Sequence, residues 1–389
     1  MRRSTLACAC LLMGGLHAAC GSPTDPNLRY RVPVQTSDGW QTASVASVGM
    51  DARPLEDLLD LVDGTPGHLL HGLLIVKDGK LVFEEYWPGV DLTPESLELV
   101  ERDFDRETLH YVASVSKSIT SALAGIALDQ GLTRSVQDPV FSYFPEHEDL
   151  RSDTSAQVTL EHLLSFSSGW DWNEHVYGFD DPRDSHYQMF NAADPVRQLL
   201  GRPFVSAPGS TFFYNSGDAN LLGEIARRAS GSATLVDFAR ARLFGPLGIE
   251  RFEWVRFGPG STLTFASGGA SLRPRDMAKL GLLYLRSGTW EGRQIVSRAW
   301  VDASTRMSVP LVGDHRTLYG YGYNWWLGRS PFRGGRAEYF RAAGWGGQYI
   351  YVYPGLNLVL VFTAGAYYDD LGLSINDIIE EYVFAAINR

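Results

Sequence analysis

The strongest constraint on the fold is the placement of strand-like segments at both ends of the chain. Residues 71–86 contain two β-type runs joined at Asp78-Gly79, a dipeptide typical of a hairpin because glycine tolerates positive φ. Near the other end, residues 349–353 and 358–364 are also predicted to be strands. With helical segments between them, this arrangement predicts an α+β fold in which the first and last strands share one antiparallel sheet flanked by helices.

The segments between these strands have helical periodicity. Apolar residues recur at helical spacing over residues 114–130, and short helical stretches such as 160–164 and 220–229 follow in the middle of the chain. We therefore expect one domain over residues 46–389. Its sheet part should comprise about 46–134 and 265–389, with further helices at 275–286 and 376–387, and its mostly helical part about 135–264.

The first twenty residues have the pattern of an export signal. Arg2 and Arg3 precede an apolar run over residues 6–16, and small residues precede Cys20. Residues 1–19 are predicted to be a signal peptide, and Cys20 resembles the lipid-bearing first residue of a bacterial lipoprotein.

His17 stands where leucine is usual in such a cleavage box, so a plain secretory cut remains open. Residues 20–45 are polar and contain prolines, as expected of a tether. The expected location is the periplasm, anchored to a bacterial membrane through the lipid only.

Charge and cysteine content exclude several classes of function. The chain has 34 Lys and Arg against 45 Asp and Glu, a net charge of −11, which disfavours nucleic acid as a partner. All three cysteines lie within the first twenty residues, so none is left for a structural disulfide, a cysteine zinc site or a cysteine nucleophile. Beyond the leader, no apolar run has the 18 or so residues that a membrane helix needs.

The first candidate catalytic motif is Ser114-Val-Ser-Lys117, at the start of the predicted core helix. A spacing of three puts Ser114 and Lys117 on one helical face, where a desolvated lysine can take the serine proton. Alone, the motif could also be a helix cap followed by a solvated lysine. However, Lys117 is one of only four lysines among the 34 cations, and arginine in effect cannot give up its proton.

Two further elements follow in the sequence. Tyr214-Asn215-Ser216 lies in a turn before a helix, where a buried tyrosine beside an ordinary cap is the alternative interpretation. Trp345-Gly346-Gly347-Gln348 precedes a strand, and its glycines would let a backbone edge approach a substrate closely. A backbone N–H there could form half of an oxyanion hole.

Taken in this order, the three elements resemble the serine beta-lactamase and penicillin-binding-protein-like superfamily, specifically its class C beta-lactamase-like esterases and amidases. The overall pattern also resembles the 6-aminohexanoate oligomer hydrolases. The resemblance covers most of the chain after about residue 45. Supporting stretches are residues 160–169, 243–249, 272–281 and 321–326.

The resemblance implies that Ser114 is the acylated nucleophile, Lys117 its proton partner and Tyr214 the relay of a proton to or from the leaving group. The N–H groups of Ser114 and Gln348 match the two oxyanion donors. The family places an asparagine at Ser216 and a lysine or histidine at Trp345, followed by threonine or glycine at Gly346. The loss of that cation weakens recognition of a substrate carboxylate.

Arg341 and Arg336 lie close enough in sequence that one could replace this missing cation, although the sequence does not show where either points. Trp170, Trp172, His186 and Tyr187 fall in the helical part and are interpreted as core residues.

The expected function is that of an exported serine hydrolase that forms an acyl-enzyme on a small ester or amide substrate, without a metal or an organic cofactor. The alternatives are a beta-lactamase or D-alanyl peptidase-like enzyme, or a cell-envelope binding protein of the same fold that does not turn over.

Overall fold

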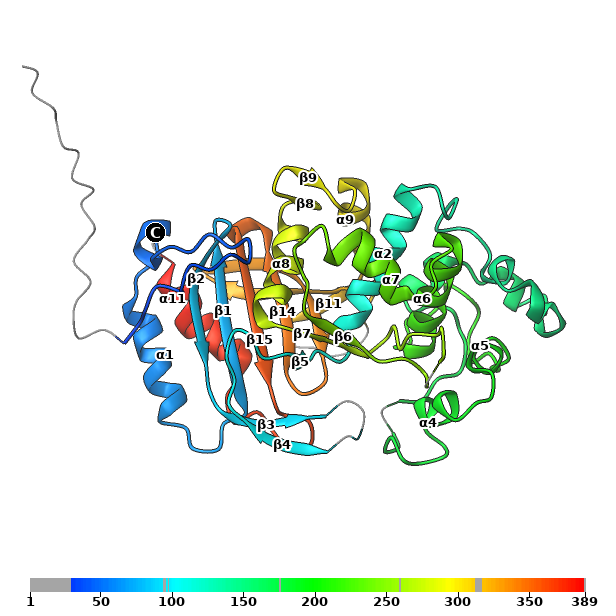
Figure 1. The fold of residues 1–389 in the computed structure, drawn as a ribbon, viewed down its shortest axis with the longest axis horizontal. Coiled ribbons are helices and arrows are strands. Elements are labelled where there is room, and N and C mark those ends of the chain that lie inside the picture. The colour runs from blue at the N-terminus through cyan, green and yellow to red at the C-terminus, as the bar shows by residue number, and fades with distance from the viewer. Residues whose placement is uncertain are drawn as a thin grey trace, which may run out of the picture.

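A central antiparallel sheet organises the protein. The computed structural model describes residues 29–93, 96, 98–174, 176–258, 260–311 and 317–387. The sheet has eight strands in the order β10-β11-β12-β13-β14-β15-β1-β2 (Figure 1). Their bounds are β10 (Val309–Pro310), β11 (Leu318–Tyr321), β12 (Trp326–Phe332), β13 (Gly335–Gly344), β14 (Gln348–Tyr353), β15 (Leu358–Ala364), β1 (Leu70–Lys77) and β2 (Lys80–Tyr86).

The pairing confirms the α+β fold expected from the sequence. The hairpin β1-β2 turns at Asp78 and Gly79, whose φ angles are 52° and 78°. The first strand β1 then pairs with the last strand β15 along its length. The two ends of the chain therefore share one sheet.

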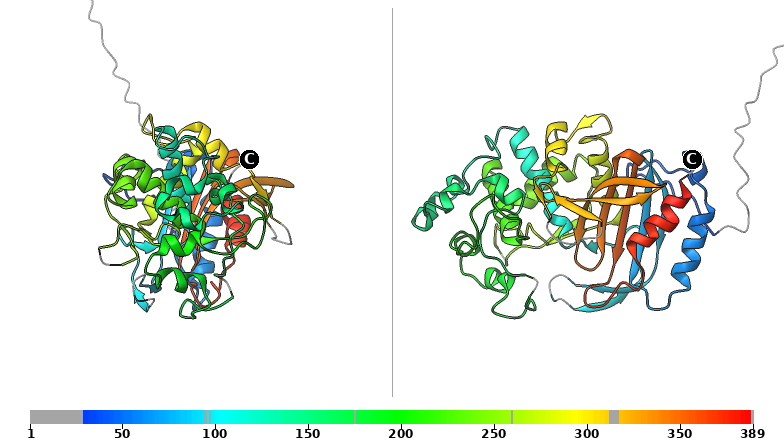
Figure 2. Two further views of the ribbon diagram at one scale, coloured as in Figure 1. Left: turned by 90° about the vertical axis from the view of Figure 1, so that its right-hand side faces the viewer. Right: turned by 180° about the vertical axis from the view of Figure 1, so that it is seen from behind.

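Helices cover both faces of this sheet. Strand side chains alternate between the two faces, and each face carries apolar residues that pack against helices. On one face, Leu358, Leu360 and Phe362 of β15 belong to a core shared with α1 (Arg53–Asp63) and the C-terminal helices. On the other face, Val359 and Val361 belong to the main core, with α2 (Val115–Asp129) and α8 (Pro274–Leu285). The right-hand view of Figure 2 shows α1 and the C-terminal helices side by side on the near side of the sheet. The C-terminal segment consists of α10 (Ile375–Asp377), a helical turn over Ile378–Val383 and α11 (Phe384–Ala386).

The helical part lies at one end of the sheet (Figure 1). Its longest helix is α6, which begins at Ser216, because the Asn215 side chain caps it by accepting a hydrogen bond of 3.1 Å from the Asp218 N–H. The expected helix at 160–164 is present. The helices of this part are α3 (Leu160–Leu164), α4 (Ser185–Phe190), α5 (Pro195–Leu200), α6 (Ser216–Ser230) and α7 (Leu235–Ala239), with shorter helical turns at Val140–Tyr143, Pro145–Leu150, Ser155–Gln157 and Arg240–Phe244.

Three small sheets complete the part of the fold that the structure describes. The strand β5 leads directly into α2 and pairs with β7, and β3 and β4 form a separate two-stranded sheet. Within the described residues, no helix is long and apolar enough to span a membrane. The bounds are β3 (Gly89–Leu92), β4 (Leu99–Arg102), β5 (His110–Tyr111), β6 (Phe252–Trp254), β7 (Ala270–Leu272), β8 (Thr289–Trp290), β9 (Arg293–Gln294) and α9 (Arg298–Ser304), with a short helical turn at Val45–Val48.

The predicted leader, residues 1–19, and Cys20 lie outside the described residues. Of the predicted tether, residues 29–45 are described and pack against the sheet. The Tyr30 hydroxyl donates to the Val82 carbonyl at 2.9 Å, and the Trp40 indole donates to the Arg275 carbonyl at 3.1 Å. This part of the chain is held in place because Tyr30 packs on Phe83 of β2 and the buried Trp40 ring lies against Trp290.

Candidate active site

The N-terminus of α2 brings Ser114 and Lys117 together. Ser114 is the N-cap residue, and Ala113 before it has a φ of 46°, a conformation that costs energy for a residue other than glycine. The Lys117 amine donates to the Ser114 hydroxyl oxygen at 2.8 Å and to the Ser267 carbonyl at 2.8 Å. The spacing predicted from the sequence is thus realised as a direct Ser-Lys contact.

Burial changes the proton affinity of Lys117. The residue is 2% exposed, and desolvation lowers its pKa to about 8, against an opposing, pKa-raising effect of the Glu174 carboxylate. A lysine of this pKa is neutral in a useful fraction of molecules near neutral pH. It can therefore accept the serine proton.

Tyr214 lies beside the same hydroxyl. Its ring centroid is 4.9 Å from the Lys117 amine, and its own hydroxyl is hydrogen-bonded to Ser114. Burial and the nearby Glu174 raise the pKa of Tyr214 well above 10, so its phenol stays protonated. The environment therefore moves the pKa values of the two groups apart. Beside Ser114, the lysine can accept a proton and the tyrosine can donate one.

A backbone edge of β13 faces this group. The strand β12 begins at Trp326, which pairs with Arg341, so in the described part of the sheet residues 342–344 of β13 pair only with β14. Gly344 is required here, since a Cβ at this position would collide with the Val112 carbonyl, two residues before Ser114. The open edge can accept backbone hydrogen bonds from a substrate.

The residues of the third motif predicted from the sequence do not all reach the cavity in the structure. Trp345 lines the cavity beside Ser114, Lys117 and Tyr214, whereas Gly346, Gly347 and Gln348 are not among its lining residues. Gln348 is fully buried, and its amide donates to the Ala364 carbonyl. Gly346 and Gly347 have φ of 84° and 92°, which forms the tight turn that presents Trp345 to the cavity.

Aromatic side chains form much of the cavity wall. The ring of Trp345 lies against Phe179 and Tyr368, with centroids 5.2 and 5.3 Å away, and Trp326 stacks on Tyr214 at 5.7 Å. Such a wall favours apolar groups of a substrate. The other aromatic lining residues include Tyr177, Phe190, Phe257, Phe265 and Tyr349.

Glu174 is a site residue that sequence reasoning missed. It lines the cavity and accepts hydrogen bonds at Oε2 from the Ser216 N–H, at 3.0 Å, and from the Trp172 indole. His186 lies 3.7 Å from the same oxygen and also lines the cavity, although the sequence suggested a core residue. Glu174 follows Trp172 in an irregular segment without a spacing motif, so only its tertiary position identifies it.

The structure also distinguishes the two arginines considered as replacement cations. Arg341 lines the cavity, with its guanidinium carbon 5.0 Å from the Tyr349 ring centroid, and its Nε has no hydrogen-bond partner among the described residues. Arg336 is exposed and does not line the cavity. Of the described residues around the cavity, no three potential metal ligands lie close enough to hold one ion.

An antiparallel sheet with helices on both faces, and a Ser-Lys pair at the start of a central helix, defines the beta-lactamase-like class of hydrolase folds. The beta-lactamase family model matches residues 71–374. The chain therefore belongs to the beta-lactamase family.

Relatives within this family include enzymes that differ in substrate. The chain is 26% identical over 210 residues to a 6-aminohexanoate-dimer hydrolase of Paenarthrobacter ureafaciens, with 51% of each chain covered. It is 28% identical over 186 residues to a D-aminopeptidase of Brucella anthropi, with 46% of this chain and 32% of that one covered. The matches thus span about half and about a third of the lengths of these two relatives.

The fold has solved counterparts. A family VIII carboxylesterase aligns with a TM-score of 0.62 at 17% identity, over 86% of this chain and 96% of that one. The family and its relatives place the chain among hydrolases with esterase, amidase and peptidase members.

Proposed function

We propose that the protein is an exported serine hydrolase that forms an acyl-enzyme on Ser114 and acts on esters or small amides. The observation that carries this proposal is the 2.8 Å contact between the Lys117 amine and the Ser114 hydroxyl, in a site that lowers the pKa of Lys117 to about 8. Export rests on the N-terminal pattern that ends at Cys20.

In the proposed acylation step, neutral Lys117 removes the proton from the Ser114 hydroxyl, whose oxygen attacks the substrate carbonyl carbon. The oxyanion accepts hydrogen bonds from two backbone N–H groups. Ser114, at the helix start, supplies one. We assign the other to Trp345, because Trp345 and Gly344 line the cavity and Gln348 does not.

Tyr214 then donates a proton to the leaving group, since its phenol is protonated and touches Ser114. Lys117 returns a proton to the phenol. In deacylation a water molecule replaces the leaving group and the same groups act in reverse order, which releases the acid and restores Ser114.

The aromatic wall around Trp345 supports uncharged acyl groups as substrates. The 6-aminohexanoate-dimer hydrolase and carboxylesterase likenesses agree with an ester or amide bond. A second candidate, a beta-lactamase or D-alanyl peptidase-like activity, is favoured by one observation. Arg341 brings a guanidinium to the cavity wall, where it could hold a substrate carboxylate.

The test is hydrolysis of a substrate panel by the purified protein. Short nitrophenyl esters, nitroanilides and nitrocefin should be compared for the wild type, Ser114→Ala and the exposed-serine control Ser142→Ala. We expect kcat/KM for neutral esters to exceed that for nitrocefin by at least about a hundredfold, with activity lost only in Ser114→Ala. Efficient nitrocefin hydrolysis would favour the second candidate, and acylation without turnover would indicate a binding protein.

A further inference from the structure

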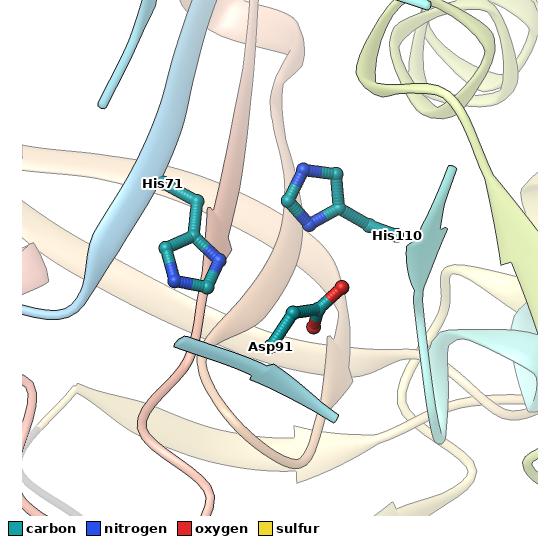
Figure 3. A group of neighbouring side chains, drawn as sticks. All are labelled: His71, Asp91 and His110. Atoms are coloured by element: carbon teal, nitrogen blue, oxygen red, sulfur yellow. The ribbon is translucent and has the colours of Figure 1, made fainter. Parts of the chain in front are cut away.

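A cluster of three buried side chains lies outside the proposed catalytic cavity. His71 comes from β1 of the central sheet, Asp91 from β3 and His110 from β5, so the cluster joins three separate sheets. One ligand atom of each residue lies within 4.8 Å of the other two. Figure 3 shows the Asp91 carboxylate facing the space between the two imidazole rings.

The backbone around the cluster is shaped to fit it. The pairing of β1 with β15 shifts register between Leu70 and Gly72, and this bulge reorients the His71 side chain. Gly89 and Gly365 leave room for its ring, since a Cβ at either position would lie 2.7 Å from a ring atom. Phe104 stacks on both imidazoles, with centroid distances of 4.0 Å to His71 and 4.6 Å to His110.

The histidines lack the partners that buried imidazoles normally have. His71 and His110 are fully buried, and neither nitrogen of His110 has a hydrogen-bond partner in the part of the chain that the structure describes. The His71 ring has only a contact with the Val90 backbone that falls short of hydrogen-bond geometry. Burial of polar atoms without partners is costly, so such a group calls for a ligand. A neutral imidazole has a lone pair on one ring nitrogen, which can bind a metal ion.

Asp91 is already held in place for a role as a ligand. Its Oδ1 accepts a hydrogen bond from the Tyr367 hydroxyl at 3.0 Å and one from the Leu92 N–H at 2.9 Å. Outer contacts of this kind orient the ligands of metal sites. A surface pocket bordered by Asp91, Thr108 and Tyr111 offers a path for an ion and a water molecule.

We propose that His71, Asp91 and His110 bind one divalent first-row metal ion, for which zinc is the best fit. Two imidazole nitrogens and one carboxylate oxygen are a donor set that suits Zn²⁺, whereas Ca²⁺ and Mg²⁺ prefer oxygen ligands alone. Tetrahedral zinc needs ligand atoms about 3.3 Å apart, so the side chains draw together by up to about 1.5 Å on binding, with water as the fourth ligand.

A metal ion at this site would stabilise the structure around the proposed catalytic cavity and would not take part in the hydrolytic reaction. His110 lies four residues before Ser114, and Tyr367 connects Asp91 to Trp345 through a ring contact of 5.2 Å. Arg102 on β4 is exposed, so solvent screens its repulsion of the ion. Metal binding at this cluster would not depend on the proposed hydrolytic activity.

The test is metal content and unfolding of the full chain, measured first on the wild type. After treatment with EDTA and dialysis against micromolar zinc sulfate, elemental analysis should find about one bound zinc per chain, and Tm should rise by several degrees over the metal-free protein. Cobalt substitution should give the visible absorption of Co²⁺ with imidazole ligands. Wild-type protein that retains no zinc and shows only the spectrum of hydrated Co²⁺ would overturn the proposal.

Variants then locate the ion. Asp91→Asn and His110→Gln should each weaken zinc binding by at least about tenfold, because each removes a ligand with little change in shape. His68→Gln is the matched control, since this half-buried histidine lies three residues from His71 and outside the cluster. If circular dichroism shows that one ligand variant does not fold, the zinc affinity of the other variant and the cobalt spectrum of the wild type test whether the cluster binds the ion. Zinc retained equally by all folded variants would place the ion elsewhere and refute the site.

Discussion

The proton affinity of Lys117 predicts the pH dependence of turnover. Only neutral Lys117 can accept the Ser114 proton, and its pKa of about 8 places the acidic limb of the kcat/KM profile near that value. At pH 7 about one lysine in ten is then neutral. We expect kcat/KM to rise about tenfold between pH 7 and a plateau above about pH 9.

Glu174→Gln tests the cause of this pKa. The Glu174 carboxylate raises the pKa of Lys117, so its removal lowers that pKa further and moves the acidic limb to lower pH. The variant should therefore retain more than a tenth of its own plateau kcat/KM at pH 7, even if the plateau itself falls. Glu148→Gln, an exposed glutamate, is the control and should leave the limb unchanged.

The assay is the initial rate on a neutral nitrophenyl ester from pH 6 to 10, corrected for spontaneous hydrolysis. Lys117→Arg should be nearly as inactive as Lys117→Ala over this range, because arginine keeps the charge but does not release its proton. A flat wild-type profile between pH 7 and 9, or a limb that moves to higher pH in Glu174→Gln, would refute the reasoning.

Three further predictions follow from other parts of the molecule. Arg341→Ala should lower kcat/KM about tenfold to a hundredfold for a nitrophenyl ester whose acyl chain ends in a carboxylate, and less than about twofold for the uncharged ester of equal length. The exposed Arg336→Ala is its control, and equal losses on both esters would exclude a carboxylate contact. Arg275→Ala should lower the free energy of unfolding by about 3–5 kcal/mol in urea titration, since it leaves the buried Glu84 carboxylate without a counter-charge, whereas Arg329→Ala in the exposed pair with Glu338 should cost less than about 1 kcal/mol. Cys20→Ser should shift the protein from the membrane fraction of a Gram-negative host to soluble or unprocessed material, and wild-type protein cleaved elsewhere than before Cys20 would contradict lipidation.

Local sequence patterns were sufficient for the main features of the fold and for part of the site. Ser114 and Lys117 are one helical turn apart, so their contact follows from helix geometry alone. The β1-β2 hairpin follows from Asp78-Gly79 between two apolar runs. By contrast, β5 and β7 have two and three residues, too few to show a period.

The rest of the site depends on tertiary packing. Glu174 reaches Ser216 across 42 residues of sequence, and no spacing rule connects the two. The turn at Gly346 and Gly347 decides that Trp345, and not Gln348, lines the cavity. His71, Asp91 and His110 come from three different sheets, so no local sequence motif predicts that they form a cluster.

The most direct test of the proposed mechanism is the location of the acyl group on the trapped enzyme. After reaction with a fluorophosphonate, or a slow ester quenched in acid, trypsin releases residues 107–117, a peptide that contains both Ser114 and Ser116. Ser116 is fully buried, and its hydroxyl donates to the Ala113 carbonyl at 2.7 Å, so it should not react. We predict that fragmentation places one label on Ser114 and that Ser114→Ala remains unlabelled, while Ser142→Ala is labelled like the wild type. A label on any other serine, or undiminished labelling of Ser114→Ala, would contradict the acyl-enzyme mechanism.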